Sequence, residues 1–422
     1  MLVKTPYSAA SAADGSKAAP VAVKSSANPA VKSPQGTPAW LGAVNDRTGL
    51  SLLLEHGPLT RNRICELAGV SKPTASLMMA RLEQSGFIVQ AGRQTGTPGP
   101  APILYAARVD RALGVAVDID AHEIRSSVVD AAGTLHPVVR APLPADPAER
   151  DPVRDIRGAI ERACAASGSD PAAVHKLCIG IPGYVDPRHS DELFTEALPK
   201  WPVTGVRDLL EDALGAQVRI ENDANLAATA ESVDGEGQGR EVFVLIWIGN
   251  GVGAAFDTNG SLHRGAFGGA GEIGFMPIPH AAIHYDESAR EVQDLIGGRA
   301  VQALLARHGI PGETLPAALD ALATAPNRHE VIEDLAPRIA ISLTPLLSVL
   351  DPELLVLGGP TGSAGGAELA ALVAGHIRAE SRWYPEVVAT SVRDNAVLQG
   401  ARELLVTEVR AELLDRVALV GA

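Results

Sequence analysis

Between residues 40 and 92, apolar side chains recur first at helical spacing and then in alternation with polar ones. Leu50, Leu53 and Leu54 share one face of a first helix, which Gly57-Pro58 ends. A second short helix is predicted over residues 61–68, and a third runs from Lys72 to about Ser85. The inward positions of these two helices are Ile64, Cys65, Leu67, Ala75, Met78 and Leu82.

The ends of these helices carry recognisable signals. Gly69 supplies a small residue at a tight turn, which lets two helices cross closely. Ser71 is a natural N-cap, and Pro73 follows in the first turn, where its missing N–H costs nothing. A strand begins at Phe87, a second returns over residues 103–105, and a flexible wing loop over 92–100 joins them. The pattern predicts a winged helix-turn-helix DNA-binding domain over residues 39–108, with a three-helix bundle for protein contacts as the alternative.

From about Leu113 onwards, strands alternate with helices. Strands are predicted over 114–119, 125–129, 176–181, 217–221, 242–247 and 354–357, and helices over 155–166, 206–214 and 330–349. Buried strands followed by glycine-rich turns indicate an α/β domain over residues 109–422. Residues 1–38 are rich in Ala, Ser, Pro and Lys and show no period, so they are predicted to be a disordered tail.

Charge separates the two parts of the chain. The 422 residues carry a net charge of −14. Residues 1–95 contain ten Lys/Arg and five Asp/Glu, whereas the remainder contains 26 Lys/Arg and 45 Asp/Glu. A basic front on an acidic body suits a DNA-reading module attached to a sensor.

Composition excludes several classes of protein. No apolar run approaches the ~20 residues that cross a bilayer, and no secretory signal is recognisable, so no membrane partner is expected. Cys65, Cys164 and Cys178 have neither metal-ligand spacing nor a disulfide pattern. A cytoplasmic location is therefore expected.

The third helix is expected to lie in a DNA major groove. Its first turns present Lys72, Thr74 and Ser76, and Met79 and Arg81 are expected near the same face. Arg61 and Arg63 open the preceding helix, where they can hold phosphates, and Arg93 in the wing can reach the backbone or the minor groove.

Four motifs follow in order along the body: Gly180 to Asp186, Glu221 to Asn225, Gly269 to Gly274, and Asp351-Pro352-Glu353 followed by Gly358-Gly359. Together with the N-terminal domain, these motifs resemble the regulator branch of the ROK family (repressors, open reading frames and kinases) over roughly residues 40–405. The resemblance implies an actin-like ATPase fold, with sugar and nucleotide sites between two α/β lobes.

The resemblance also assigns the ligand site. Asp223 matches the catalytic base of the family's kinases, and Asn222 and Glu272 match positions that hydrogen-bond sugar hydroxyls. Gly183 belongs to the first motif and is placed at the same site. These residues therefore predict a sugar or sugar derivative as ligand, although Asn222, Asp223 and Glu272 could instead be retained for structure.

The phosphate turns depart from the family. Its kinases carry Asp-x-Gly-Gly-Thr after the first strand, where this chain has Asp118-Ile119-Asp120-Ala121-His122. Side chains replace both glycines, and Asp120 adds negative charge where phosphates would bind. The second turn, with Gly249, Gly251 and Gly253, stays close to the family pattern. One intact phosphate turn out of two disfavours ATP binding and leaves residual nucleotide binding open, and we expect no catalysis and no cofactor.

Family features beyond the cleft are also altered. Phe275 stands where the family has a histidine, no cysteine occurs in 277–297, and Gln293 stands where a Glu is expected. His280 and His284 have a spacing that binds metal only on a helix, which Pro277 and Pro279 disfavour, so no metal is expected. The wing ends in Gly99-Pro100 without the arginine that family regulators often carry.

These features together predict a repressor of carbohydrate-related genes that forms a homodimer or a dimer of dimers and binds a palindromic DNA operator. Its body is predicted to sense a sugar or sugar derivative without phosphorylating it. Two alternatives stay open from the sequence. One is an active ATP-dependent sugar kinase with a regulatory head, and the other is a repressor that needs no ligand.

Overall fold

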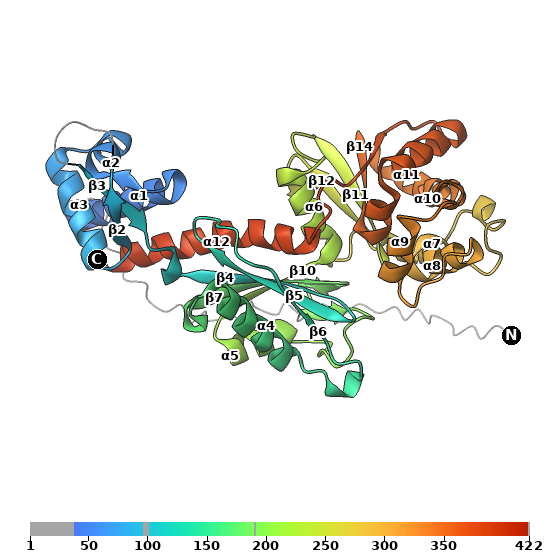
Figure 1. Cartoon of the computed structure of the whole chain (residues 1–422), viewed down its shortest axis with the longest axis horizontal. Coiled ribbons are helices and arrows are strands. Elements are labelled where there is room, and N and C mark those ends of the chain that lie inside the picture. Colours follow the sequence, from blue (N-terminus) through green and yellow to red (C-terminus); the bar gives the residue numbers. More distant parts are fainter. Residues whose placement is uncertain (1–37, 96–100, 190, 421–422) are drawn as a thin grey trace, which may run out of the picture.

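The computed structural model describes residues 38–95, 101–189 and 191–420; residues 1–37 of the predicted tail and the tip of the wing loop lie outside them. The N-terminal elements are α1 (Pro38–His56), β1 (Leu59–Thr60), α2 (Arg61–Ala68), α3 (Lys72–Gln84), β2 (Ile88–Arg93) and β3 (Ile103–Ala107). The three strands form an antiparallel sheet in the order β1-β3-β2. The predicted winged helix-turn-helix fold is confirmed (Figure 1).

Local signals determine where these helices begin and end. The side chain of Thr60 accepts a hydrogen bond from the N–H of Arg63 and begins α2, and Gly69 ends it with a left-handed φ of 64°. Ser71 caps α3 through the N–H of Thr74. Each of these contacts lies within four residues in the chain, which is why both helices could be predicted.

The first lobe of the body is built on a five-stranded sheet in the order β10-β7-β4-β5-β6. Its strands are β4 (Leu113–Ile119), β5 (Glu123–Asp130), β6 (Val139–Pro142), β7 (Val174–Ile181) and β10 (Gln217–Asn222). Helices α4 (Pro152–Ser167) and α5 (Val206–Leu214) cover one face, where Val115 and Val117 are buried. The short hairpin of β8 (Tyr184–Asp186) and β9 (Glu192–Phe194) follows β7.

The second lobe contains a sheet in the order β13-β12-β11-β14-β15. Its strands are β11 (Val242–Ile248), β12 (Val252–Thr258), β13 (Ser261–Leu262), β14 (Leu354–Gly358) and β15 (Glu386–Ala389). Helix α6 (Asp223–Asp234) packs on the face that carries Phe243 and Leu245. The opposite face is covered by α7 (Val292–Ile296), α8 (Gly298–Arg307), α9 (Leu315–Leu322), α10 (Arg328–Leu350) and α11 (Gly359–Glu380).

The last helix, α12 (Ala396–Val420), connects all three parts of the molecule. Its first half packs between α6 and the face of the first lobe that α4 and α5 leave open, where Ala116 meets Ala401 and Leu405. Its second half runs out to the winged helix, as the red helix of Figure 1 shows. There Val409, Leu413, Leu414 and Val417 enter the same apolar core as Leu50 and Met78. The C-terminal helix is therefore a structural part of the N-terminal domain, which the sequence did not indicate.

Within the part of the chain that the structure describes, none of the helices combines the length and the apolar character needed to cross a membrane.

Candidate ligand cleft and nucleic-acid interface

Asn222 lies where β10 ends and α6 begins. Its side-chain oxygen caps α6 by accepting from the N–H of Asn225 at 3.1 Å, and its amide nitrogen donates to the carbonyl of Gly183 at 3.0 Å. The structure thus brings the predicted residues Asn222 and Gly183 together. Both ends of the Asn222 amide are engaged, so this side chain holds the Gly183 turn against α6 as well as facing the site.

Asp223 and Glu272 are the carboxylates predicted to bind the ligand, and they lie close enough together for the charge of Glu272 to act on Asp223. Asp223 accepts one hydrogen bond, from the N–H of Ala224 at 2.8 Å. Its pKa is raised to about 7, chiefly by burial and further by the nearby charges of Asp118 and Glu272, although the Ala224 bond opposes the shift. Burial also raises the pKa of Glu272, whose side chain has no hydrogen bond or ion pair among the described residues. Both carboxyl groups therefore keep free acceptor positions, which a polyol can fill.

Tyr184 forms an aromatic wall beside these carboxyl groups. Its ring stacks on Phe194 with centroids 4.8 Å apart, and its hydroxyl is close enough to Glu272 for that charge to contribute to a raised pKa, after burial. A Cβ at Gly269 would lie 2.9 Å from the Tyr184 ring, so only glycine allows this packing. A cavity of about 570 Å³ borders Tyr184 and Asn222, whereas Asp223 and Glu272 are not among the residues that line it. Tyr184 belongs to the first motif, directly after Gly183, but it was not predicted as a site residue.

The first phosphate turn is filled by its own side chain. The Oδ1 of Asp120 accepts from the N–H of His122 at 2.7 Å and from that of Glu123 at 2.9 Å. These are backbone donors of the turn between β4 and β5, which is the kind of turn that binds phosphate through its N–H groups. The Asp120 carboxylate therefore already occupies donors that a phosphate group would need.

Arg125 closes the same turn from the side. Its guanidinium lies 2.6 Å from Asp118, 3.4 Å from Asp120 and 2.5 Å from Glu123. The pKa of the buried Asp118 is nevertheless raised to about 6, because burial outweighs the attraction of Arg125. One arginine thus forms ion pairs with three carboxylates, and these four side chains form an ion-pair cluster at the turn.

The second phosphate turn keeps an open backbone. Between β11 and β12, the N–H of Gly249 donates to the carbonyl of Gly251 at 2.9 Å, and a Cβ at Gly251 would meet nothing within 4 Å. Gly253 continues into β12, and α11 begins close by at Gly359, which has a φ of 74°. The two turns therefore differ: the one in the second lobe keeps its glycines and its space, and the one in the first lobe does not.

The segment after Gly274 does not fit a zinc site. Phe275 is 51% exposed, His280 lies in a short 3₁₀ turn (His280–Ala282), and His284 bonds to the carbonyl of Ala281. No group of three or more His, Cys, Asp or Glu side chains could hold a metal in the described ranges. Gln293 bonds to Glu291 at 3.1 Å. The segment is instead tied to α10 by Arg338, which donates to the carbonyl of Tyr285 and lies 4.8 Å from its ring centroid.

The cations predicted to contact DNA differ in whether they are already bonded to other residues of the winged helix. Lys72 is exposed and makes no hydrogen bond or ion pair with the described part of the chain. Arg61 donates to the Tyr105 hydroxyl at 3.1 Å, Arg63 pairs with Glu66 at 3.1 Å, and Arg93 donates to the carbonyl of Ala101 at 2.9 Å. All four are on the surface, so contact with phosphates requires only that these weak surface interactions exchange.

Two residues expected on the outer face of α3, Met79 and Arg81, lie elsewhere or are engaged in the structure. Met79 is only 1% exposed and packs in the head core, so its prediction as a surface residue was wrong. Arg81 pairs with the buried Asp46 at 2.6 Å and thereby ties α3 to α1. Thr74 is half-buried, and its hydroxyl is 2.8 Å from that of the capping Ser71. Ser76 is half-buried, and the neighbouring Leu77, which was not predicted, is 63% exposed.

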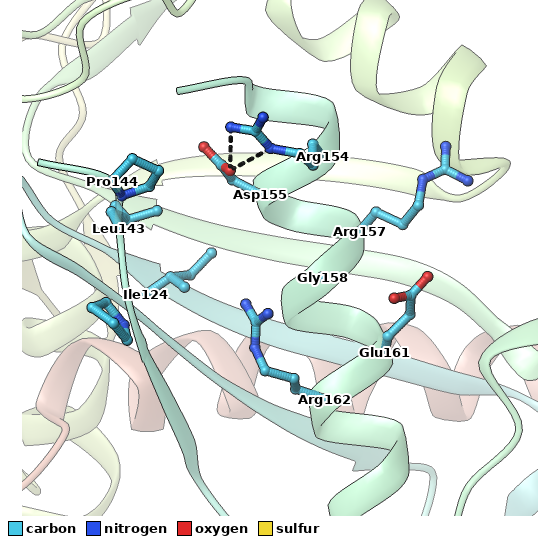
Figure 2. A pocket seen from close by; sticks show the side chains of 10 residues that line it. Ile124, Leu143, Pro144, Arg154, Asp155, Arg157, Gly158, Glu161 and Arg162 are labelled. Atoms are coloured by element: carbon cyan, nitrogen blue, oxygen red, sulfur yellow. Dashed lines mark hydrogen bonds and ion pairs between the residues drawn. The ribbon is translucent and has the colours of Figure 1, made fainter. Parts of the chain in front are cut away.

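A second cavity, of about 310 Å³, lies between α4 and the strands β5 and β6. In Figure 2, Arg154 and Arg162 lie on the side facing Leu143 and Ile124, and Arg157 points away. None of the predicted site residues lines it.

The fold and cleft define a two-lobed, sugar-kinase-like body that carries a winged helix-turn-helix. The chain belongs to the ROK family, whose model matches residues 114–408. It is 21% identical over 397 residues to the xylose repressor of Caldicellulosiruptor bescii, covering 89% of this chain and 98% of that one. It is 28% identical over 317 residues to the glucokinase of Streptomyces coelicolor, covering 69% of this chain and 97% of that one.

Among solved structures, a ROK family transcriptional regulator described as a homolog of the E. coli MLC protein matches with a TM-score of 0.60 and 17% identity. The match covers 90% of this chain and 99% of that chain. This likeness confirms the fold, with the head and the two lobes in one chain.

Proposed function

We propose that this protein is a transcription repressor that binds an operator through its winged helix and senses a sugar or sugar derivative in the cleft of its kinase-like body. The extent of the similarity supports this reading. The match to the xylose repressor covers 89% of the chain, whereas the body from residue 109 makes up only about three quarters of it. The match to the repressor must therefore extend into the head, whereas the match to the glucokinase, which covers 69% of the chain, is no longer than the body alone.

One observation carries the proposal that the body senses rather than phosphorylates: the Asp120 carboxylate occupies the backbone donors of the first phosphate turn. A bound nucleotide would bring further negative charge beside Asp118 and Asp120, which repels it. The sugar-facing carboxyl groups, Asp223 and Glu272, remain free to accept hydroxyl hydrogen bonds. A cleft with open polyol acceptors and a filled phosphate turn suits a binding site for sugar alone.

Ligand binding and DNA binding are connected through helices. Asn222 and Asp223 form the first residues at the N-terminal end of α6, and α6 packs directly on α12. The far half of α12 is part of the head core. In our proposal, a sugar at Asp223 shifts α6 and α12 together, which changes the separation of the two heads in a homodimer. Operator half-sites have a fixed spacing, so such a shift changes affinity.

DNA binding and catalysis can be tested on the same purified protein. Duplexes bound by the wild type are selected from a random library, and ADP release is measured with ATP and a panel of hexoses. We expect selected duplexes whose affinity falls in the Lys72→Ala and Arg61→Ala variants, with a weaker dependence on salt, and no ADP release above background. Binding by both variants that equals the wild type would show that the assigned face is wrong.

The second candidate function is a sugar kinase with a regulatory head. It is favoured by Asp223, whose pKa of about 7 suits a general base, and by the open second turn at Gly251. ADP release at a rate ordinary for kinases, between 1 and 100 per second in order of magnitude, would establish it instead.

A repressor that needs no ligand is distinguished by thermal stability. A sugar that binds the folded protein must raise its melting temperature, because binding stabilises the folded state by mass action. We expect at least one sugar in a broad panel to do so in the wild type and to lose this effect in Glu272→Ala. An unchanged melting temperature with every sugar would support the ligand-independent repressor.

A further inference from the structure

The outer face of α3 is apolar over most of its length. Pro73, Leu77 and Ala80 are all exposed, and their spacing of four and then three residues places them on one side of the helix. Leu77 is 63% exposed although it lies between the two buried positions Ala75 and Met78. The helix therefore presents a continuous apolar strip, here called the α3 strip, to its surroundings.

The polar residues of α3 provide few ways to read bases. The Thr74 hydroxyl is bonded to Ser71, and Arg81 is held by Asp46. Ser76 is half-buried. Because Arg81 is paired, Lys72 is the one free cation among residues 72–81. The segment contains no Asn or Gln for paired hydrogen bonds to adenine, and its arginine is engaged elsewhere.

The surroundings of the strip identify what covers it. Lys72 at the start of α3 and Arg61 at the start of α2 carry positive charge without an ion-pair partner among the described residues, Arg63 is paired with Glu66, and residues 72–82 contain no acidic side chain. A charged helix edge with an apolar centre complements a DNA major groove, where phosphates line the sides. The 5-methyl group of thymine is the apolar group that bases present there.

We propose that Leu77 determines DNA sequence specificity by packing against thymine methyl groups in each operator half-site, with Pro73 and Ala80 extending the contact. This inference rests on the proposed DNA-binding function. It predicts that discrimination at the centre of each half-site depends on shape and methyl contact rather than on paired hydrogen bonds.

The test removes the methyl group and the side chain separately. In a duplex selected by the wild-type protein, each thymine is replaced in turn by deoxyuridine, which keeps base pairing and deletes only the methyl group. Binding of full-length wild type and Leu77→Ala is measured by fluorescence anisotropy. We expect at least one thymine per half-site at which deoxyuridine weakens wild-type binding about fourfold, the effect of one buried methyl-sized group, but leaves Leu77→Ala unchanged.

Two further variants make the result specific. Leu77→Met retains an apolar side chain and should keep the response to deoxyuridine. Leu135→Ala removes a leucine that is 81% exposed in the body and should behave as the wild type. Melting curves check that each variant is folded.

Equal losses in wild type and Leu77→Ala at every thymine would overturn the proposal for Leu77 and leave DNA binding intact. A library from which the wild type selects no duplex would overturn DNA binding and this inference with it. The two failures are therefore distinguishable.

Discussion

At the scale of single residues, the cleft combines groups whose roles differ although their positions follow one family pattern. Asn222 is engaged at both ends of its amide, whereas Glu272 has no partner among the described residues. Asp120 turns inward and binds the donors of its own turn. Sequence reasoning identified the negative charge of Asp120 but not this orientation, because the direction of one side chain depends on the path of the surrounding backbone.

The raised pKa of Asp223 predicts a pH dependence of stability. Its pKa of about 7 in the folded protein exceeds the value near 4 of an unfolded chain, so the folded state binds more protons between these values. Its contribution to stability is therefore complete below pH 4 and is lost as pH rises through 7. Asp223→Asn should raise the stability at pH 8 by the order of 1 to 2 kcal/mol and have little effect at pH 4, measured by denaturation at both values.

The control for this variant is Asp257→Asn, a buried carboxyl of the second lobe whose pKa is also raised by burial but which lies away from the cleft. Addition of a stabilising sugar should reduce the benefit of Asp223→Asn and leave that of Asp257→Asn unchanged. A stability difference at Asp223 that is the same at pH 4 and pH 8 contradicts the raised pKa.

Restoring the family turn tests the role of Asp120 directly. Asp120→Gly combined with Ala121→Gly and His122→Thr recreates the family's Asp-x-Gly-Gly-Thr sequence after Asp118. Because the backbone N–H groups are then released, we expect ATP affinity to rise at least tenfold, measured by calorimetry. The single change His122→Thr, which keeps the Asp120 carboxylate, is the matched control and should leave ATP affinity low.

At the scale of elements, features that depend on contacts between residues close in the sequence were predicted accurately, and features that depend on contacts between distant elements were not. The bounds of α2 and α3 depend on Thr60, Gly69 and Ser71, which act within a few residues, and they were predicted closely. Met79 was misplaced because its burial depends on other elements that pack against α3 in the head core. The lobes were predicted as an α/β arrangement from buried strands, but the pairing of the strands and the contact between α6 and α12 are long-range properties.

Gly400 controls how closely α6 and α12 approach. A Cβ at this position would lie 1.8 Å from the carbonyl oxygen of Leu226, an atom of the α6 backbone that cannot turn aside. Gly400→Ala should therefore push the two helices apart and lower the melting temperature by several degrees, in line with the cost of overpacking. If the two helices transmit the ligand signal, it should also reduce the effect of a stabilising sugar on operator affinity.

The matched control is Gly375→Ala. Gly375 lies exposed within α11, and a Cβ there would meet nothing within 4 Å. Because alanine favours a helix more than glycine does, this variant should be as stable as the wild type or slightly more so. Equal behaviour of the two variants would mean that α6 and α12 tolerate a wider separation.

At the scale of the whole molecule, the N-terminal and C-terminal parts of the chain form one core. Leu413 is fully buried beside head residues, and Arg47 of α1 forms an ion pair with Asp415 of α12. The head is therefore joined to the body by a helix that shares its interior as well as by the chain at residue 108. Nothing in the local pattern of residues 396–420 indicates this, since an apolar stripe does not say which domain will cover it.

Leu413→Asp tests this shared core. A buried carboxylate without a partner should destabilise the head by more than about 3 kcal/mol and abolish operator binding, while sugar binding by the body persists. Limited proteolysis, operator binding and the sugar-induced thermal shift measure the three effects. Ala411→Asp places the same charge on the exposed side of α12 and should leave all three unchanged; loss of sugar binding in Leu413→Asp would instead mean that body and head unfold as one unit.

The shared core also has a consequence for biosynthesis. The reading head is translated first, but the side chains from Val409 to Val417 that complete its interior leave the ribosome last. A nascent or prematurely terminated polypeptide therefore lacks part of the hydrophobic support for its DNA-binding surface. Only finished molecules, which already contain the sensor, should therefore bind the operator, and incomplete products that lack the ligand-responsive body should not.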